Sequence, residues 1–153
     1  ERLRQRLLEL YLGHIAVHTA LFPGISSLLN QLAEKNIAWG IATNKPAAYT
    51  LPLMAALDIK PAPISVICPD HVARSKPDPE SLFLASQQIG CTPEEIIYIG
   101  DHKRDIDCGK GAGSITIAAT YGYLDSSDNV ATWNADYCVN HADEIWPIIE
   151  KYL

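Results

Sequence analysis

The residues IIYIGD, from Ile96 to Asp101, carry the strongest structural signal in this sequence. A continuous apolar run that ends in glycine and aspartate is typical of a central parallel strand, buried on both faces, with an acidic side chain at its carboxyl end. The residues TPEE that begin at Thr92 match a capping box just before this run. A helix is expected to begin near Arg104, so the segment predicts a strand followed by a helix.

Strands and helices alternate on both sides of this segment. Helical periodicity and end signals predict helices over residues 25–35, 46–57, 80–89 and 145–152, and apolar runs predict strands over residues 37–43, 64–67 and 115–119. Gly90 suits the position just past a helix end, and Pro52 is expected to kink or shorten its helix. The alternation predicts an α/β fold with a doubly wound parallel sheet. An amphipathic helix over residues 3–18 precedes it and is expected to belong elsewhere.

Composition limits the classes of protein and partner. The chain has 153 residues, 48% apolar and 20% charged, as in a single globular domain. Its net charge of −6 makes nucleic acid an unexpected partner. The four cysteines form no C-x-x-C pair, which favours the reducing cytoplasm over a disulfide framework or a zinc site. No apolar stretch reaches the roughly 20 residues of a membrane span, and a start at Glu1 rather than methionine raises the possibility of a fragment or a processed product.

Chemically useful side chains follow the predicted strands. Thr43 and Asn44 close one strand, and Lys76 lies in a Lys-Pro-Asp-Pro turn. Asp101 and Asp105 follow the central strand. Because function in a doubly wound sheet collects at the carboxyl ends of its strands, these groups are expected to converge on one edge. A hydroxyl can bind phosphate oxygens, a lysine can neutralise a transferring phosphoryl group, and two aspartates are ligands suited to Mg²⁺.

Each of these groups also has an ordinary structural interpretation. Thr43 and Asn44 suit the closure of a turn, and Lys76 suits a solvated loop. Asp101 and Asp105 are acids of the kind favoured near a helix N-terminus. The order and spacing of all of them within one α/β pattern favour a functional interpretation over these separate ones.

Together these residues resemble motifs two, three and four of the haloacid dehalogenase superfamily. The segments ICPDHV from Ile67, SKPDPE from Ser75 and YGY from Tyr121 are similar to its phosphoglycolate phosphatase-like branch, and within it to the bacterial N-acetylmuramic acid 6-phosphate phosphatases. The likeness covers essentially the whole chain. It implies a Rossmann-like core domain over residues 21–153 and the last helix of a cap domain in residues 1–20.

The resemblance also implies roles for the candidate residues. Thr43 and Asn44 would hold the phosphate, and Lys76 would orient the nucleophile and the phosphate. Asp101 would bind Mg²⁺, while Asp105 would support either the metal or Lys76. The expected catalytic residues are therefore Lys76, Asp101 and Thr43. The expected partner is a small phosphorylated metabolite such as phosphoglycolate or N-acetylmuramic acid 6-phosphate.

The chain departs from the family pattern in two places. His102 stands where relatives often have aspartate or serine, so the surroundings of the metal are expected to differ. The Asp-x-Asp-Gly-Thr element, which supplies the nucleophile and the general acid, is absent, and DID from Asp105 to Asp107 begins a helix instead of following a strand. In the family the strand of that element lies between those ending at Thr43 and Asp101. The sheet is therefore expected to lack its first strand, which an N-terminal segment would complete.

The expected function is hydrolysis of a phosphomonoester through an aspartyl-phosphate, with Mg²⁺ as the cofactor and the nucleophile outside this chain. The chain alone is expected to be inactive. The alternative is a non-catalytic phosphate-binding or regulatory module that lacks the nucleophile. A dehalogenase is a third alternative, which the pair Asp101 and Asp105 disfavours because dehalogenases need no magnesium.

Overall fold

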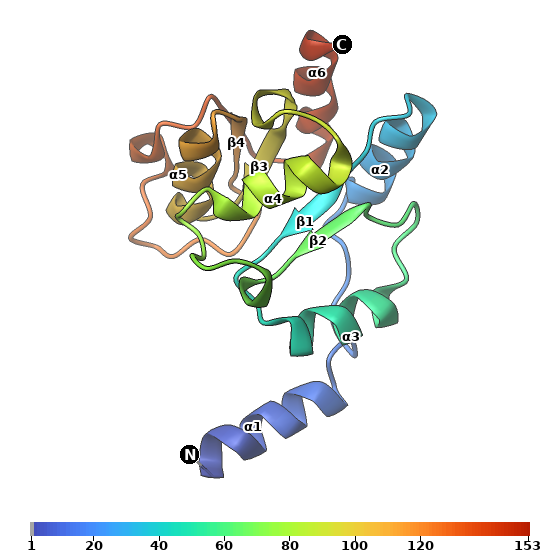
Figure 1. Ribbon diagram of the computed structural model, residues 1–153, viewed down its shortest axis with the longest axis vertical. Helices are drawn as coiled ribbons and strands as arrows, with labels where there is room; N and C mark the ends of the chain where they lie inside the picture. Colours follow the sequence, from blue (N-terminus) through green and yellow to red (C-terminus); the bar gives the residue numbers. More distant parts are fainter. Residues whose placement is uncertain (1) are drawn as a thin grey trace.

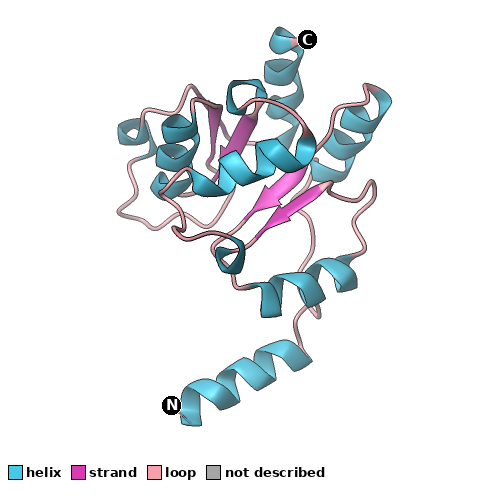
Figure 2. Ribbon diagram, in the orientation of Figure 1, coloured by secondary structure: helices cyan, strands magenta, loops and turns pink. Residues whose placement is uncertain are grey.

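Five parallel strands form two separate sheets in the computed structural model, which describes residues 2–153. In the smaller sheet β1 (Gly40–Ala42) pairs with β2 (Ser65–Ile67). In the larger sheet the order is β3 (Ile97–Gly100), β4 (Ile115–Ala119) and β5 (Tyr137–Val139). Figure 2 shows the strands at the centre of the molecule, with helices around them.

Helices cover both faces of the strands. They are α2 (Ile25–Glu34), α4 (Glu80–Ile89), α5 (Lys103–Ala112) and α6 (Ile145–Ile149), whereas α3 (Ala47–Leu57) has only Thr50 buried. Ile97 and Ile99 of β3 pack in one core cluster with α2 and α6, whereas Tyr98, the residue between them, packs in another with α4 and α5. Successive side chains of a strand point to opposite faces, so both faces of β3 are covered. This arrangement confirms the predicted doubly wound α/β fold.

Most predicted elements lie at or near their expected positions. The helix 80–89 and the strand 115–119 coincide with α4 and β4. Gly90 takes the left-handed conformation just past α4, with φ 82°, and Thr92 forms the predicted capping box. The strand expected over residues 37–43 is shorter, because only Gly40–Ala42 pairs as β1. Strand β5 was not predicted, since its three residues are too few to show a periodic pattern.

Two helices differ in part from their predictions. Helix α3 runs through Pro52 to Leu57, so the proline does not shorten it, and the alternative of a kink stays a prediction. A proline removes only one N–H donor, and here the helix continues on both sides of it. The first helix, α1 (Arg2–Gly13), ends earlier than the predicted residue 18. A ring nitrogen of His14 bonds the Leu10 carbonyl at 3.0 Å, which engages an acceptor that the next turn of the helix would use.

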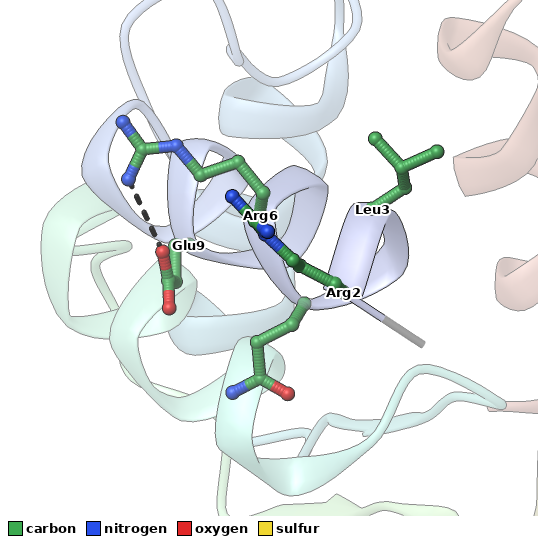
Figure 3. A pocket seen from close by; sticks show the side chains of 5 residues that line it. Arg2, Leu3, Arg6 and Glu9 are labelled. Carbon is green, nitrogen blue, oxygen red and sulfur yellow. Dashed lines mark hydrogen bonds and ion pairs between the residues drawn. The ribbon is translucent and has the colours of Figure 1, made fainter.

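Helix α1 lies at the edge of the molecule next to α3 (Figure 1), and none of its residues is buried. Figure 3 shows a hollow along its first turns, and the residues that line it, all from α1 itself, are Arg2, Leu3, Gln5, Arg6 and Glu9. The hollow therefore gathers no groups from the core. Among residues 2–153 every helix, α1 included, is too short or too polar to cross a membrane. The division into a cap helix (1–20) and a core (21–153) stays a prediction.

The two sheets meet at β1 and β3. Among the described residues these strands share no ladder of backbone hydrogen bonds. Side chains bridge the break instead: the Tyr98 hydroxyl donates to the Ala42 carbonyl at 3.2 Å, and the Lys76 ammonium donates to the same oxygen at 3.0 Å. The break lies where the sequence places the lacking strand, so the fold agrees with that interpretation.

Ile117→Ala is expected to lower the free energy of unfolding by about 2–5 kcal/mol, because Ile117 is completely buried in β4 and its truncation leaves a cavity. Ile64→Ala is the matched control. Ile64 is 61% exposed, and its truncation should cost about 0.5 kcal/mol or less. Urea denaturation followed by circular dichroism measures both changes. Equal losses would contradict the placement of Ile117 in the core.

Asp136 links β4 to the chain that enters β5. Its carboxylate accepts hydrogen bonds from the N–H and the hydroxyl of Thr116, at 2.8 and 2.7 Å, and the Lys110 ammonium lies 3.6 Å away. Burial alone would raise the pKa of Asp136, but the Thr116 bonds and the Lys110 charge outweigh it and hold that pKa below its ordinary value.

A lowered pKa makes Asp136 a source of acid sensitivity. The carboxylate contributes stability above its ordinary pKa of 3.8, and this contribution is lost as the pH falls through the lower folded-state value. Thr116→Val removes the hydroxyl bond and is expected to make stability depend less on pH between about pH 5 and pH 3. Urea midpoints over that range test this, and identical curves for the two proteins would count against it.

Candidate active site

The loop after β1 holds Thr43 and Asn44 in fixed positions. The Thr43 N–H donates to the Ile67 carbonyl at 2.9 Å, which continues the pairing of β1 with β2. The Thr43 hydroxyl accepts a hydrogen bond from the Lys45 N–H at 3.0 Å. The Asn44 side chain donates to the Lys76 carbonyl at 3.1 Å. The loop is therefore tied to the turn that carries Lys76, as the prediction of a shared edge requires.

Lys76 lies between the two sheets, and its side chain is only 9% exposed. Its ammonium donates to the Ala42 carbonyl at 3.0 Å, to the Tyr98 hydroxyl at 3.1 Å and to the Asp105 carboxylate at 2.7 Å. A buried charge persists only when it is paired and hydrogen-bonded. These contacts therefore keep a positive charge at the carboxyl ends of β1 and β3.

Asp105 is as deeply buried as its partner, with a side chain 8% exposed, and both of its oxygens are bonded. One oxygen pairs with Lys76, and the other accepts from the His102 N–H at 3.1 Å. Gly100 provides the space, because a Cβ at this position would overlap the Asp105 side chain. Asp105 was expected to support either the metal or Lys76, and its hydrogen bonds fit the second role.

His102 is the N-cap of α5. Its ring nitrogen Nδ1 accepts a hydrogen bond from the Arg104 N–H at 3.2 Å, and the ring stacks on Trp133 with the centroids 6.4 Å apart. With Asp105 bonded to the His102 N–H, the two side chains form a capping box. Helix capping is therefore a structural reason for the histidine at this position.

Asp101 turns toward the loop that follows β4. One of its carboxylate oxygens accepts from the Tyr123 N–H at 3.1 Å. Gly122 permits this approach, because a Cβ there would overlap the Asp101 carboxylate. The loop is anchored by Thr120, whose N–H donates to the Val139 carbonyl of β5 at 2.9 Å. The direction of the Asp101 side chain thus depends on the path of the chain after β4.

An aromatic cluster lies beside Asp101. Phe22, from the segment between α1 and α2, packs against Tyr121 and Tyr123 with ring centroids 5.3 and 5.9 Å apart. Burial raises the pKa of Tyr121, and the negative charge of Asp101 raises it further. The phenol of Tyr121 therefore stays neutral, and the cluster presents uncharged aromatic rings next to the carboxylate.

The predicted site residues fall into two groups. Asn44, Lys76 and Asp105 belong to one hydrogen-bonded network, with Thr43 next to Asn44 in the chain, whereas Asp101 bonds a different loop. In the part of the chain described here, no group of three or more His, Cys, Asp or Glu side chains is arranged to hold a metal. Magnesium needs only one or two protein carboxylates, with water and substrate oxygens completing its shell, so Asp101 fits such an ion. The functional roles of all five residues stay predictions.

Tyr98 belongs to the same network, and the sequence interpretation missed it. Its hydroxyl contacts both the Ala42 carbonyl and the Lys76 ammonium. Burial, and then the charge of Asp105, raise the pKa of Tyr98 far above its ordinary value, so the hydroxyl remains a hydrogen-bond donor. A tyrosine in an otherwise aliphatic buried strand needs a partner for its hydroxyl, and this was the signal that could have identified it.

Asp105→Asn is expected to lower the free energy of unfolding by about 3–5 kcal/mol, because it leaves the Lys76 charge buried without a counter-charge. Asp107→Asn on the same helix is the matched control. Asp107 pairs with Lys103 at the surface, and its loss should cost less than about 1 kcal/mol. Guanidinium denaturation measures the difference. Two equally small losses would show that the Lys76–Asp105 pair is not a buried one.

Comparisons with known proteins identify the family. Residues 1–119 match the haloacid dehalogenase-like hydrolase family. The chain is 42% identical over 153 residues to the N-acetylmuramic acid 6-phosphate phosphatase of Pseudomonas aeruginosa, covering 100% of this chain and 68% of the relative. It is 37% identical over 123 residues to the phosphoglycolate phosphatase of Escherichia coli K12, covering 80% of this chain and 49% of the relative. It therefore spans about two thirds of the first relative and about half of the second.

Solved structures share the fold. A predicted phosphoglycolate phosphatase from Haemophilus somnus superposes with a TM-score of 0.83 at 23% identity, over 91% of this chain and 61% of that one. CbbY from Rhodobacter sphaeroides, solved in complex with phosphate, superposes with a TM-score of 0.78 at 24% identity, over 90% and 61%. The family match and the identity to the curated relatives lead to one conclusion: the chain belongs to the haloacid dehalogenase-like hydrolases.

Proposed function

We propose that the whole protein hydrolyses a small phosphomonoester in a magnesium-dependent reaction, through an aspartyl-phosphate whose aspartate lies outside this chain. The observation that carries the proposal is the buried ammonium of Lys76, held in one network with the Thr43–Asn44 loop at the break between the sheets. A fixed cation next to hydroxyl and N–H donors is what a transferring phosphoryl group requires.

Each residue of the network has a defined task in this proposal. Thr43 and Asn44 bind the phosphate oxygens through the hydroxyl and the N–H groups of their loop. Lys76 neutralises the charge on the phosphoryl group, exchanging one of its neutral acceptors for a phosphate oxygen. Asp105 and Tyr98 hold the Lys76 ammonium in place. Little reorganisation is needed during the reaction, because these groups are already oriented.

The covalent steps take place on the aspartate outside the chain. Its carboxylate oxygen would attack phosphorus as the ester P–O bond breaks, and the alcohol would leave with a proton from the general acid of the same Asp-x-Asp element. Water then attacks the aspartyl-phosphate, which releases inorganic phosphate and restores the carboxylate. Neither Asp105 nor Asp107 is proposed as the nucleophile, because both lie in the first turns of α5 instead of directly after a strand. The chain alone is therefore proposed to be inactive.

Asp101 is the residue proposed to hold Mg²⁺. Its carboxylate is oriented by the Tyr123 N–H and lies at the same edge as Lys76. When bound, the ion supplies positive charge to the phosphate oxygens and leaves the hydrogen-bonded Asp105 free to serve Lys76. In this proposal Asp101 binds the metal and Asp105 pairs with Lys76.

The proposed substrate is a phosphate ester that also carries a carboxylate. The relatives are named for phosphoglycolate and N-acetylmuramic acid 6-phosphate, and both compounds are phosphorylated carboxylic acids. A cytoplasmic location suits such metabolites. It also suits the cysteines of the described chain, which are all free thiols.

Two further proposals concern the parts that surround the site. Helix α1, with no buried residue, is proposed to be the last helix of a cap domain in residues 1–20, attached to a core over residues 21–153. A segment on the N-terminal side is proposed to insert a strand between β1 and β3. The break in the sheet supports this, because a strand placed there would pair backbone groups on both edges.

A non-catalytic phosphate-binding module remains the alternative, favoured by the lack of an Asp-x-Asp-Gly-Thr element in these residues. The two functions differ in a direct way. The module binds phosphate esters without turnover, whereas the enzyme releases inorganic phosphate from them. A longer natural sequence that still lacks the element would support the module.

Lys76→Ala and Asp101→Ala are each expected to lower kcat by about 10²–10³-fold in the full-length protein, because each removes a charge that stabilises the transition state. Release of inorganic phosphate from phosphoglycolate, with and without Mg²⁺, measures the effect. Lys103→Ala is the control, since Lys103 pairs only with Asp107 at the surface. Unchanged turnover in both active-site variants would refute the proposal.

A further inference from the structure

Lys45 directly follows the Thr43–Asn44 loop, and its backbone is held on both sides. Its N–H donates to the Thr43 hydroxyl at 3.0 Å. Its carbonyl accepts a hydrogen bond from the Thr50 hydroxyl at 2.9 Å, in the first half of α3. The start of the Lys45 side chain is therefore a fixed point, two residues from the group proposed to bind phosphate.

The ammonium of Lys45 differs from that of Lys76 in its partners. Within residues 2–153 Lys45 forms no ion pair with a carboxylate, whereas Lys76 is paired with Asp105. The Lys45 ammonium instead contacts the Tyr11 hydroxyl and lies 4.9 Å from the centroid of the same ring. Tyr11 packs edge-on against Tyr49 of α3, with the centroids 5.9 Å apart. A phenol positions this cation without neutralising it.

We infer that Lys45 binds the carboxylate of the substrate, at the end of the substrate that does not react. This inference rests on the proposed phosphatase function and deepens it by assigning the group that selects phosphorylated acids. The site then has two cations with separate tasks: Lys76 inside the network serves the phosphoryl group, and Lys45 at its rim serves the second anion. An unneutralised ammonium gains a charge-assisted hydrogen bond when a carboxylate arrives.

The spacing suits this assignment. Residues two apart in a chain lie at most about 7 Å from each other, so a phosphate at Thr43 is within a short molecule's length of the Lys45 side chain. The carboxylate of phosphoglycolate follows its phosphate after one oxygen and one carbon. Both anions of such an acid can therefore be bound by one loop, with the Lys45 ammonium positioned by its contact with Tyr11 of α1.

A purely structural role for Lys45, as an anchor for α1 through Tyr11, gives different expectations. An anchor that is lost would weaken the binding and hydrolysis of every phosphate ester to the same degree. A carboxylate-binding group that is lost would weaken acids selectively. The ratio between an acid and a neutral ester of similar size therefore separates the two roles.

The test compares phosphoglycolate with ethyl phosphate, its counterpart without a carboxylate, in the full-length protein with Mg²⁺. The ratio of their kcat/KM values is expected to fall about tenfold or more in Lys45→Met, the usual effect of losing a hydrogen bond to a charged group, and to recover largely in Lys45→Arg. Lys60→Met is the control, since Lys60 pairs with Asp58 at the surface. An unchanged ratio in Lys45→Met would overturn the inference.

Calorimetry distinguishes failure of this inference from failure of the proposed function. If the full-length protein hydrolyses neither ester, the phosphatase proposal fails, and binding of the two esters then decides the role of Lys45. Tighter binding of phosphoglycolate than of ethyl phosphate, with the preference lost in Lys45→Met, would support the inference. Equal binding of both esters by the unaltered protein would overturn it.

Discussion

The buried pair of Lys76 and Asp105 is the interaction on which the remaining structure of this edge depends. Each charge is removed from water, so each must find its hydrogen bonds within the protein. Lys76 donates hydrogen bonds to a carbonyl at the end of β1 and to the Tyr98 hydroxyl of β3. Asp105 accepts one from the His102 N–H of the α5 capping box. Two sheets that share no ladder are thereby bridged by the Lys76 and Tyr98 side chains, and the turn that carries Lys76 is held against the start of α5.

The sequence predicted that Asn44, Lys76 and Asp105 lie together, because parallel strands bring their carboxyl ends to one edge. Helix ends marked by Gly90 and Thr92 were equally predictable, since a positive φ and a capping box depend on local residues alone. The direction of Asp101 was not predictable. It depends on Gly122, some twenty residues away in sequence, and no local pattern reports such a contact. The pairing of β5 was not predicted either, because a strand of three residues shows no periodic pattern.

The charges of the site are arranged in layers. The buried Lys76 ammonium is paired with Asp105, and its other hydrogen bonds go to the Ala42 carbonyl and the Tyr98 hydroxyl instead of to solvent. Asp101 presents a negative group at one side, next to neutral aromatic rings, and Lys45 presents a positive group at another. A dianionic phosphate bound here would also lie near the Asp101 carboxylate. A metal ion on Asp101 would then be needed to balance the negative charge on that side. Under the proposed function, this local arrangement of charges would let an anionic metabolite bind despite the net charge of −6.

Gly122 has a consequence that reaches beyond the turn in which it lies. The loop it occupies is fastened to the end of β5 through Thr120, and it also orients the carboxylate of Asp101. The orientation of the Asp101 carboxylate is therefore linked to the pairing of β5 with the end of β4. Val139 of β5 also belongs to the main hydrophobic cluster, so loss of β5 would disturb the core as well as this loop. Packing of the C-terminal part of the chain is thus coupled to a side chain at the shared carboxyl edge of β3 and β4.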